Sequence, residues 1–259
     1  MKPHQKSFPK KRPAAIRRNR SRKTAHLQIY GVHAVLAACA NPQRKLHRLF
    51  VTRNIQNQYE TRLKAAQCPI EILTSQEISR MAPENAVHQG ILAKVAPLPA
   101  TDLEDLKDCQ LILVLDQVTD PHNVGAILRS AAAFNAEAVI ITARNSPEAT
   151  GVLAKTASGG LEHVPLVEAV NLARALDTLG KQGFTCIGFD SEAEFALEKA
   201  PISAPIALVM GAEGKGLRRL TREKCDLLVR LDMPGPIKSL NVSNAAALAL
   251  YATSKAFLR

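Results

Sequence analysis

Residues 233–243 read Met-Pro-Gly-Pro-Ile-Lys-Ser-Leu-Asn-Val-Ser and run directly into an alanine-rich segment. The Pro-Gly-Pro sequence predicts an irregular loop, because proline fixes φ and lacks an amide donor while glycine tolerates positive φ. Ser239, Asn241 and Ser243 carry side chains that cap helices, so we predict a helix over 242–257. A loop followed by a donor-rich helix start is typical of a ligand pocket, and also of a capped helix that only closes a core.

The predicted helix carries a stripe of small residues on one face, which would let another backbone approach closely. The stripe consists of Ala245, Ala249, Ala252 and Ala256. The sequence therefore places a packed interface beside the loop.

Charge is unevenly distributed along the 259 residues. Ten of the 34 Lys and Arg residues lie in 1–25, where there is no acid, which leaves 24 basic against 23 acidic residues elsewhere. This predicts a basic, disordered tail on a nearly neutral body. Such a tail binds polyanions through counterion release. The alternatives are a solvated tail without a partner and an organelle transit peptide, although its prolines interrupt an amphipathic helix.

Other functional classes receive no support from the sequence. The five cysteines are scattered and form no C-x-x-C pair, which fits buried thiols in a reducing compartment. The histidines form no metal-ligand spacing, and no apolar run approaches the ~20 residues that span a bilayer. We expect a soluble, cytoplasmic protein without a metal and without a membrane partner.

Hydrophobic patterning divides the chain into a small α/β unit at 27–96, a linker at 97–108 and a larger unit at 109–259. In the small unit we predict helices at 31–40, 59–67 and 75–81 and strands at 48–52, 70–73 and 91–95. In the larger unit we predict strands at 111–115, 138–142, 184–189, 206–210 and 227–231, and helices at 124–135, 148–157 and 168–182.

Alternating apolar strands and helices predict a parallel sheet covered on both faces. Ligands of such sheets lie beyond the carboxyl ends of the strands. Three polar or glycine-rich loops follow predicted strands, at 116–123, 211–216 and 233–241, and we expect them to gather at one edge.

The first of these loops leads into a helix that carries Asn123 and Arg129. These residues are six apart, which places them within roughly 120° of each other around the helix axis. An arginine on an otherwise apolar helix is costly to bury and is expected to meet an anion. The alternative is a structural ion pair with Asp116 or Glu213.

The second loop holds Gly211, Gly214 and Gly216, which allow close approach of a ligand to backbone amides. It matches neither the G-x-G-x-x-G pattern nor a Walker A loop. On its own it is also compatible with a tight turn.

Three stretches together resemble the signature motifs of the SpoU (TrmH) RNA methyltransferases, in the same order. They are Asp120-Pro-His-Asn-Val-Gly-Ala-Ile-Leu-Arg129, Val209-Met-Gly-Ala-Glu-Gly214 and Ser239-Leu-Asn-Val-Ser243. The resemblance covers about 110–259. The unit at 27–96, opening with Ile29-Tyr-Gly-Val-His-Ala-Val-Leu36, is similar to the ribosomal-protein-like RNA-binding domain of members that methylate 23S rRNA.

The resemblance implies an α/β fold whose C-terminal domain is a SPOUT-type parallel sheet with a deep trefoil knot. It implies S-adenosylmethionine as cofactor, a homodimer through the alanine face, and methylation of a guanosine ribose 2'-hydroxyl in the peptidyl-transferase loop of 23S rRNA. The matching positions imply cofactor contacts at Gly211, Leu231 and Leu240, with Met210 and Ser239 as further candidates. In the family, residues 233–243 would thread through the loop after Gly211.

The same matches imply that Arg129 is the central catalytic residue. Free arginine is too basic to act as a proton acceptor, so we expect Arg129 to anchor a phosphate and to stabilise the developing alkoxide. Asn123 and Asn241 would orient the substrate, and Glu213 would fix Arg129 or its counterpart in the dimer. Alternatives are the same chemistry on tRNA or another rRNA site, and a non-catalytic RNA-binding ribosome-assembly factor.

Overall fold

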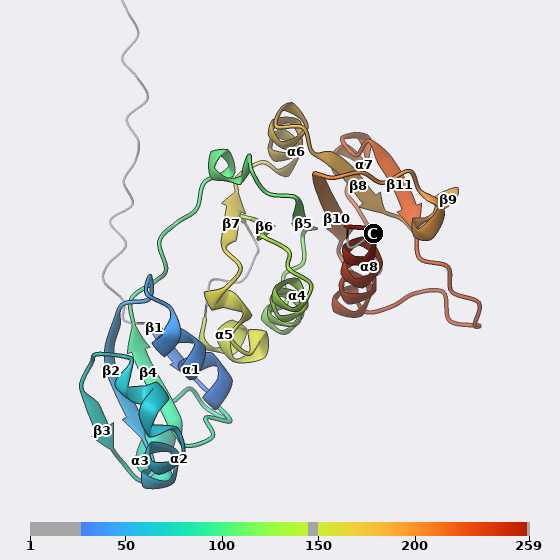
Figure 1. Ribbon diagram of the computed structural model, residues 1–259. Helices are drawn as coiled ribbons and strands as arrows, with labels where there is room; N and C mark the ends of the chain where they lie inside the picture. Colours follow the sequence, from blue (N-terminus) through green and yellow to red (C-terminus); the bar gives the residue numbers. More distant parts are fainter. Residues whose placement is uncertain (1–26, 145–149, 258–259) are drawn as a thin grey trace, which may run out of the picture.

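The computed structural model describes residues 27–144 and 150–257, which form two β-sheets flanked by helices (Figure 1). The N-terminal sheet contains β1 (Leu27–Tyr30), β2 (Leu46–Val51), β3 (Ile70–Ile72) and β4 (Ile91–Val95). The helices around it are α1 (Val32–Ala40), α2 (Arg53–Lys64) and α3 (Ser75–Met81). The predicted basic tail at 1–25 lies outside the described residues.

The N-terminal sheet has the strand order β1-β4-β2-β3. β4 runs antiparallel to β1 and β2, whereas β2 and β3 are parallel. Local sequence sets where its helices begin. The Thr74 hydroxyl accepts a hydrogen bond from the Glu77 amide and the Glu77 carboxylate accepts one from the Thr74 amide, which is a capping box for α3.

The second sheet is entirely parallel and has the order β7-β6-β5-β10-β8-β11-β9. Its strands are β5 (Leu111–Asp116), β6 (Ala138–Thr142), β7 (Leu166–Ala169), β8 (Thr185–Phe189), β9 (Phe195–Ala196), β10 (Ile206–Gly211) and β11 (Leu227–Arg230). The helices are α4 (Pro121–Ala133), α5 (Gly151–Ala157), α6 (Leu172–Lys181), α7 (Arg219–Glu223) and α8 (Val242–Phe257). Short 3₁₀ turns lie at Leu103–Leu106, Gly160–Glu162 and Leu197–Lys199.

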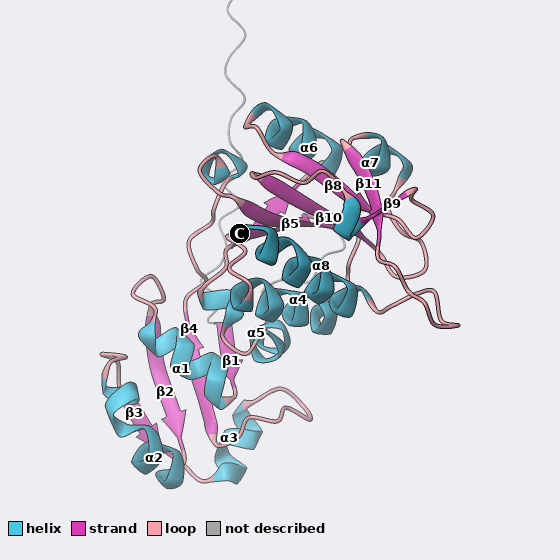
Figure 2. Ribbon diagram, turned by 45° about the vertical axis from the view of Figure 1, so that its right-hand side comes forward, coloured by secondary structure: helices cyan, strands magenta, loops and turns pink. Residues whose placement is uncertain are grey.

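Helices cover both faces of the parallel sheet (Figure 2). Along β5, Leu111, Leu113 and Leu115 join the hydrophobic cluster that contains residues of α4 and α8. Ile112 and Val114 point the other way and pack with residues of α6. Alternate side chains of a strand face opposite sides, so a continuous apolar run is what a doubly covered sheet requires.

The centre of the sheet is a switch point. From β5 the chain continues to β6 on one side, whereas from β10 it continues through α7 to β11 on the other side. Parallel sheets bind ligands beyond the carboxyl ends of such strands. The fold therefore predicts a ligand site at the loops that follow β5, β10 and β11.

The two sheets are joined by a contact that we call the inter-domain seam, formed by α5 and Gly160–Glu162 against β1, α1 and Arg44. The Arg44 guanidinium forms an ion pair with the Glu162 carboxylate at 2.6 Å, and the two side chains are only 1% and 3% exposed. Gly151 lies so close to β1 that a Cβ there would be 2.5 Å from the Gln28 carbonyl oxygen. One hydrophobic cluster runs through both sheets.

Most predicted elements are confirmed, four of them with the observed bounds: 75–81, 91–95, 138–142 and 242–257. The helix predicted at 59–67 is confirmed over 59–64, but its bounds are wrong, because Thr52 caps a helix that already begins at Arg53 and ends at Lys64. The helix predicted at 168–182 begins only at Leu172, because β7 occupies 166–169 and Asn171 is the cap. The strands β1, β7 and β9 and the helix α7 were not predicted.

The part of the small-residue stripe of α8 that is formed by Ala245, Ala249 and Ala252 packs inside the chain. Ala249 is fully buried, and Ala245 and Ala252 join the same hydrophobic cluster beside α4. The expectation that this stripe forms a face between subunits is therefore wrong. The exposed face of α8 instead carries Leu248 and Tyr251, which are 49% and 46% exposed. Within the described residues, no helix is long and apolar enough to cross a membrane.

Candidate active site

The three loops at the carboxyl edge of the sheet meet at Asn241. The Asn241 Nδ2 group donates a hydrogen bond to Asn123 Oδ1 at 3.0 Å and a longer one to Glu213 Oε2 at 3.4 Å. Asn123 lies in the first turn of α4 after β5, and Glu213 lies just after β10. The structure thus brings together three of the four side chains predicted to be catalytic.

Asn241 is held in one orientation because it also begins α8. Its Oδ1 atom accepts hydrogen bonds from the Ser243 amide at 2.9 Å and from the Ser243 hydroxyl at 2.6 Å. Its carbonyl oxygen accepts one from the Ala245 amide at 3.0 Å. Of the predicted caps, Asn241 therefore serves the helix, whereas Ser239 lies exposed in the preceding loop.

Beside this cluster lies a cavity of about 370 Å³, which we call the edge cavity. It is lined by Gln117, Val118, Thr119, Asp120, Asn123, Ala212, Glu213, Lys215 and Val242. Lys215 is the one lysine or arginine in this described lining, opposed by the carboxylates of Asp120 and Glu213. The described lining is therefore polar and has one more carboxylate than it has cations.

Gly211 is required where β10 ends. A Cβ at this position would lie 2.1 Å from the backbone carbon of Gly216, because the following loop folds back and the Gly216 amide donates to the Ala212 carbonyl at 2.9 Å. The buried Asp116 carboxylate pins the loop, accepting from the Arg218 amide at 3.0 Å and from Arg218 Nε at 2.6 Å. Asp116 is thus paired with Arg218 and not with Arg129.

The remaining residues predicted to hold a cofactor lie around this edge. Met210 is buried in β10, Leu231 is half-buried at the end of β11, and Leu240 is 38% exposed. The loop at 232–240 extends away from the sheet (Figures 1 and 2). Among the described residues, none accepts a hydrogen bond from a backbone amide of this loop. Neither Leu240 nor Ser239 lines the edge cavity.

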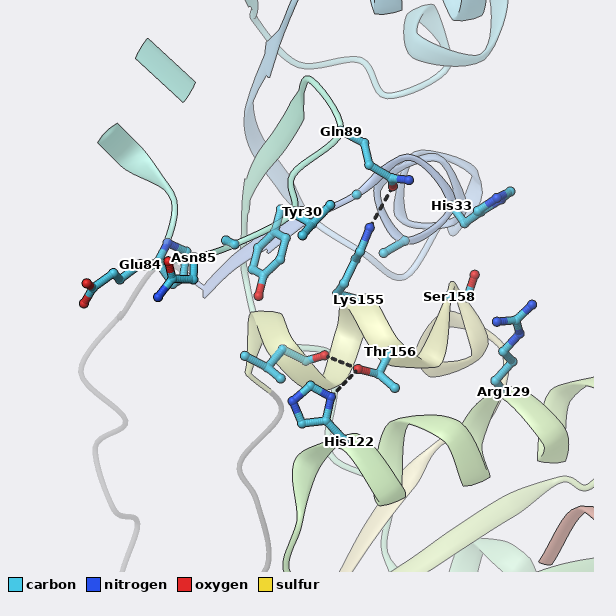
Figure 3. Close-up of a pocket in the computed structure, with 16 residues that line it drawn as sticks. Tyr30, His33, Glu84, Asn85, Gln89, His122, Arg129, Lys155, Thr156 and Ser158 are labelled. Carbon is cyan, nitrogen blue, oxygen red and sulfur yellow. Dashed lines mark hydrogen bonds between the residues drawn. The ribbon is translucent and has the colours of Figure 1, made fainter. Parts of the chain in front are cut away.

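Arg129 lies apart from the Asn123 cluster. It is exposed and lines a second cavity, of about 640 Å³, between the two domains, which we call the inter-domain cavity (Figure 3). Its offset of about 120° from Asn123 around the helix is enough to turn the two side chains into different cavities. No described residue forms a hydrogen bond or ion pair with Arg129, so the alternative of a structural pair with Asp116 or Glu213 is wrong.

Other reactive groups offer no competing site. Burial raises the pKa of Cys186 and of Cys225 to about 12, so both remain thiols at neutral pH. All five cysteines are free. Within residues 27–144 and 150–257, no group of three His, Cys, Asp or Glu side chains is arranged to hold a metal ion.

Several residues that line these cavities were not predicted from the sequence as site residues. Lys215 directly follows the motif at 209–214, so its place between Gly214 and Gly216 was a usable signal. Lys155 and Gln89 line the inter-domain cavity from different domains, with Lys155 Nζ donating to Gln89 Oε1 at 2.7 Å. A contact between residues 66 apart has no local signal in the sequence.

Two family profiles match the chain. Residues 110–251 match the SpoU rRNA Methylase family, and residues 28–101 match a profile described as RNA 2'-O ribose methyltransferase substrate binding. The first match includes Asn123, Arg129, Glu213 and Asn241. The two matches fall on the two sheets.

Curated relatives match over most of the chain. A protein of Pseudomonas putida named as a 23S rRNA (guanosine-2'-O-)-methyltransferase is 40% identical over 233 residues, which are 86% of this chain and 94% of the relative. The protein of that name in Photorhabdus laumondii is also 40% identical, with 95% of its length covered. A Synechocystis protein named as a tRNA/rRNA methyltransferase is 38% identical, but this chain spans only 61% of its length.

Solved structures share the fold. The SpoU methyltransferase AviRb from Streptomyces viridochromogenes, solved with its cofactor AdoMet, has a TM-score of 0.76 at 21% identity and covers 90% of this chain and 91% of its own. A structure described as an RNA 2'-O ribose methyltransferase has a TM-score of 0.75 at 24% identity and covers 91% of this chain and 90% of its own. The predicted α/β architecture with a parallel C-terminal sheet is confirmed, while the knot stays a prediction.

Proposed function

This chain belongs to the SpoU rRNA methylase family, and from that membership we propose that it transfers a methyl group from S-adenosylmethionine to the ribose 2'-hydroxyl of a guanosine in 23S rRNA. The observation that carries the proposal is the 40% identity, over 94% of its length, to the Pseudomonas putida protein named for that reaction. The target that we propose is a guanosine in the peptidyl-transferase loop. Because rRNA is its substrate, we place the enzyme in the cytoplasm.

We assign separate tasks to the two domains. Residues 27–96 bind the RNA substrate, residues 109–259 bind the cofactor and carry out the transfer, and 97–108 connect them. The substrate-binding description of the profile at 28–101 supports the first assignment. The tail at 1–25 adds positive charge for RNA binding.

The loop at 232–240 and the end of β10 fit an adenosyl cofactor. Backbone amides without partners can donate to its ring nitrogens and hydroxyl groups, and the leucines at 231 and 240 offer apolar contact to its ring. We therefore keep Gly211, Leu231 and Leu240, with Met210 and Ser239, as the residues that hold S-adenosylmethionine. When bound, this cofactor supplies an electrophilic methyl group, so the hydroxyl needs placement and loss of its proton.

Asn123 and Glu213 are the groups that we assign to the substrate ribose. The amide group of Asn241 is used by Asn123, Glu213 and Ser243, so Asn241 fixes the other two and does not itself need to touch the substrate. Asn123 keeps its Nδ2 donors without a partner among the described residues. These donors suit a ribose or phosphate oxygen, and the Glu213 carboxylate suits a hydroxyl or a guanidinium.

The guanidinium of an arginine is a hydrogen-bond donor and a cation, so we assign Arg129 a role through its charge and not as a base. Its place in the inter-domain cavity supports the first part of its predicted role, the anchoring of a phosphate. Stabilising the alkoxide requires a guanidinium in the edge cavity. We propose that a second copy of the chain supplies it.

The exposed face of α8 supports a homodimer of this kind. Val242, which is buried, lines the edge cavity at the start of the helix, and Leu248 and Tyr251 are exposed further along the same helix. A second copy packed on this face would lie next to the edge cavity. The subunit contact is thus proposed for Leu248 and Tyr251 in place of the alanine stripe.

The function is tested by incubating the protein with S-adenosylmethionine and a 23S rRNA fragment that contains the peptidyl-transferase loop, then mapping ribose methylation. We expect one 2'-O-methylguanosine, lost in Arg129→Ala and reduced by at least about 100-fold in Asn123→Ala, as for removal of an oriented polar group in an active site. Arg174→Ala on α6 is the matched control. Absence of methylation by the wild type on any rRNA fragment, with intact folding, contradicts the proposal.

The shared site is tested by complementation. Arg129→Ala and Asn123→Ala are each inactive, but mixed dimers regain activity if one copy supplies the arginine and the other the asparagine. A mixture that stays inactive, although mass spectrometry shows mixed dimers, contradicts a shared site. Leu248→Arg, which places a charge on the proposed contact, is expected to give monomers in sedimentation experiments.

A further inference from the structure

The inter-domain cavity is built by both domains. The N-terminal part contributes the segments 30–34 and 83–89, and the second domain contributes α4 and α5. In Figure 3, Lys155 points from α5 toward Gln89, whereas Thr156 of the same helix lies beside His122 of α4. In the proposed transfer Arg129 anchors a phosphate here, and the other lining residues take no part in that reaction.

The described lining of the cavity is positively charged. Arg129 and Lys155 are its cations, His33 and His122 add ring nitrogens, and Glu84 is the one carboxylate. Lys155 Nζ has a neutral partner, Gln89 Oε1 at 2.7 Å, and Arg129 has none among the described residues. Partial burial lowers the pKa of Lys155, because it disfavours the charged form of the amine.

Neutral hydrogen-bonding groups surround these charges. Thr156, Ser158 and Asn85 line the cavity, and the Thr156 hydroxyl lies 3.5 Å from His122 Nδ1. Arginine and lysine together with hydroxyl and amide side chains are the usual partners of nucleic-acid phosphates. Positively charged grooves of this kind follow the backbone of single strands.

Contacts at the inter-domain seam form this cavity before any ligand binds. The Lys155 stem lies against Gly31, where a Cβ would be 2.6 Å from Lys155 Cδ, and Gln89 Oε1 also accepts from the Val32 amide at 3.1 Å. The buried pair of Arg44 and Glu162 fixes the same two domains. A preformed site loses little free energy to ordering when a ligand binds.

From these observations, and resting on the proposed function, we propose that the inter-domain cavity binds the sugar–phosphate backbone of a single-stranded segment of the substrate RNA, with one phosphate on Lys155 and another on Arg129. His122 lines this cavity and Asn123, the next residue, lines the edge cavity. A strand bound here therefore passes the first turn of α4, at the edge of the candidate active site. Lys155 and Gln89 are positioning residues for the RNA.

The test measures binding of the full chain to a fluorescent single-stranded RNA from the peptidyl-transferase loop over a series of salt concentrations. Lys155→Gln removes a charge-assisted phosphate contact and is expected to raise Kd by about tenfold. It also lowers the slope of log K against log salt by about 0.7, the value for one phosphate of a single strand. Lys155→Arg keeps the charge and is expected to bind within about threefold of the wild type.

Two further variants keep the test decisive if Lys155→Gln loosens the seam. Asn85→Asp adds one negative charge to the cavity with almost no change of shape, at a position with φ of 60° that aspartate tolerates. It is expected to weaken RNA binding by a similar factor. Lys181→Gln, which removes an exposed lysine from α6 on the opposite face of the sheet, is expected to leave Kd and the salt slope unchanged.

The inference is overturned if Lys155→Gln and Asn85→Asp both bind RNA with the affinity and the salt slope of the wild type. It is also overturned if Lys155→Arg weakens RNA binding as much as Lys155→Gln does. Methyl transfer is measured separately in the wild type. Cavity-dependent RNA binding without any methyl transfer contradicts the proposed function and leaves the inference standing. Methyl transfer with cavity-independent binding contradicts the inference alone.

Discussion

The inter-domain seam and the loop at 232–240 differ in how their polar groups are satisfied. At the seam, Arg44 binds Glu162 and the Ala96 carbonyl, Asn41 also binds Glu162, and a shared hydrophobic cluster surrounds them. In the loop, no described group accepts from a backbone amide, and Ile237 is 72% exposed. The polar groups of the seam are paired within the chain, whereas the loop has backbone amide donors without acceptors among the described residues and an exposed apolar side chain.

This difference separates stability from ligand binding. Buried, fully paired groups fix the relative position of the two domains, and with it the inter-domain cavity. Segments that bind ligands are commonly drawn from the least stable parts of a fold, because their groups must be available. We therefore expect changes at the seam to reduce the free energy of unfolding, and changes in the loop to reduce cofactor affinity.

The largest effect is expected from breaking the seam. Arg44→Met leaves the buried Glu162 carboxylate without its cationic partner, which costs about 3–5 kcal/mol of the free energy of unfolding. Urea denaturation followed by circular dichroism measures this cost. The double change Arg44→Met with Glu162→Leu is expected to recover most of it, since replacing both members of a buried pair is often neutral. A loss below about 1 kcal/mol in Arg44→Met contradicts the seam as described.

An intermediate effect is expected at the edge of the sheet. Gly211→Ala forces a Cβ to 2.1 Å from the Gly216 backbone, which costs about 1–3 kcal/mol and displaces the loop beside the cofactor residues. Calorimetry should show at least about tenfold weaker S-adenosylmethionine binding, which equals about 1.4 kcal/mol. Gly235→Ala is the control. Nothing lies within 4 Å of a Cβ there, so stability should change by less than about 0.5 kcal/mol.

The smallest effect concerns pH at the segment that carries Gln89. His88 Nδ1 accepts a hydrogen bond from the Gly90 amide at 3.0 Å, and Nε2 lies 2.9 Å from Ser79 Oγ. Because Nδ1 can accept only when it carries no proton, these contacts favour the neutral ring. Burial, aided by the charge of Lys155, lowers the pKa of His88. The unfolded chain therefore takes up the proton first as pH falls. This stabilisation is complete above about pH 6.5, the ordinary pKa, and is lost as pH falls from there toward the lowered pKa.

Urea midpoints measured between about pH 5 and 8 test this, with a slope of at most about 1.4 kcal/mol per pH unit from one group. His88→Gln should remove that slope below about pH 6.5 while lowering stability at neutral pH, because the Gly90 amide loses its acceptor. An unchanged slope in His88→Gln contradicts the assignment.

Much of this organisation was available from the sequence. Apolar runs such as 138–142 predicted strands with the observed bounds. The position of three loops directly after parallel strands predicted that the segments carrying Asn123, Glu213 and Asn241 gather at one edge. β7 was missed because Leu166–Ala169 is a short edge strand that continues into a helical pattern. The position of Arg129 was misjudged because an angle around one helix does not say which neighbours flank it. The ion pair of Arg44 with Glu162 joins residues 118 apart and has no local pattern.

The central claim is that the polar groups of the seam are paired in the free protein, whereas the backbone amides of the loop at 232–240 find their acceptors in S-adenosylmethionine. Hydrogen–deuterium exchange with and without S-adenosylmethionine tests it most directly. We predict strong protection of peptides covering 231–241 and 211–217 on cofactor binding, with slow and unchanged exchange in β1, α1 and α5. Cofactor binding that leaves 231–241 exchanging as fast as before, or that protects the seam instead, would contradict the account.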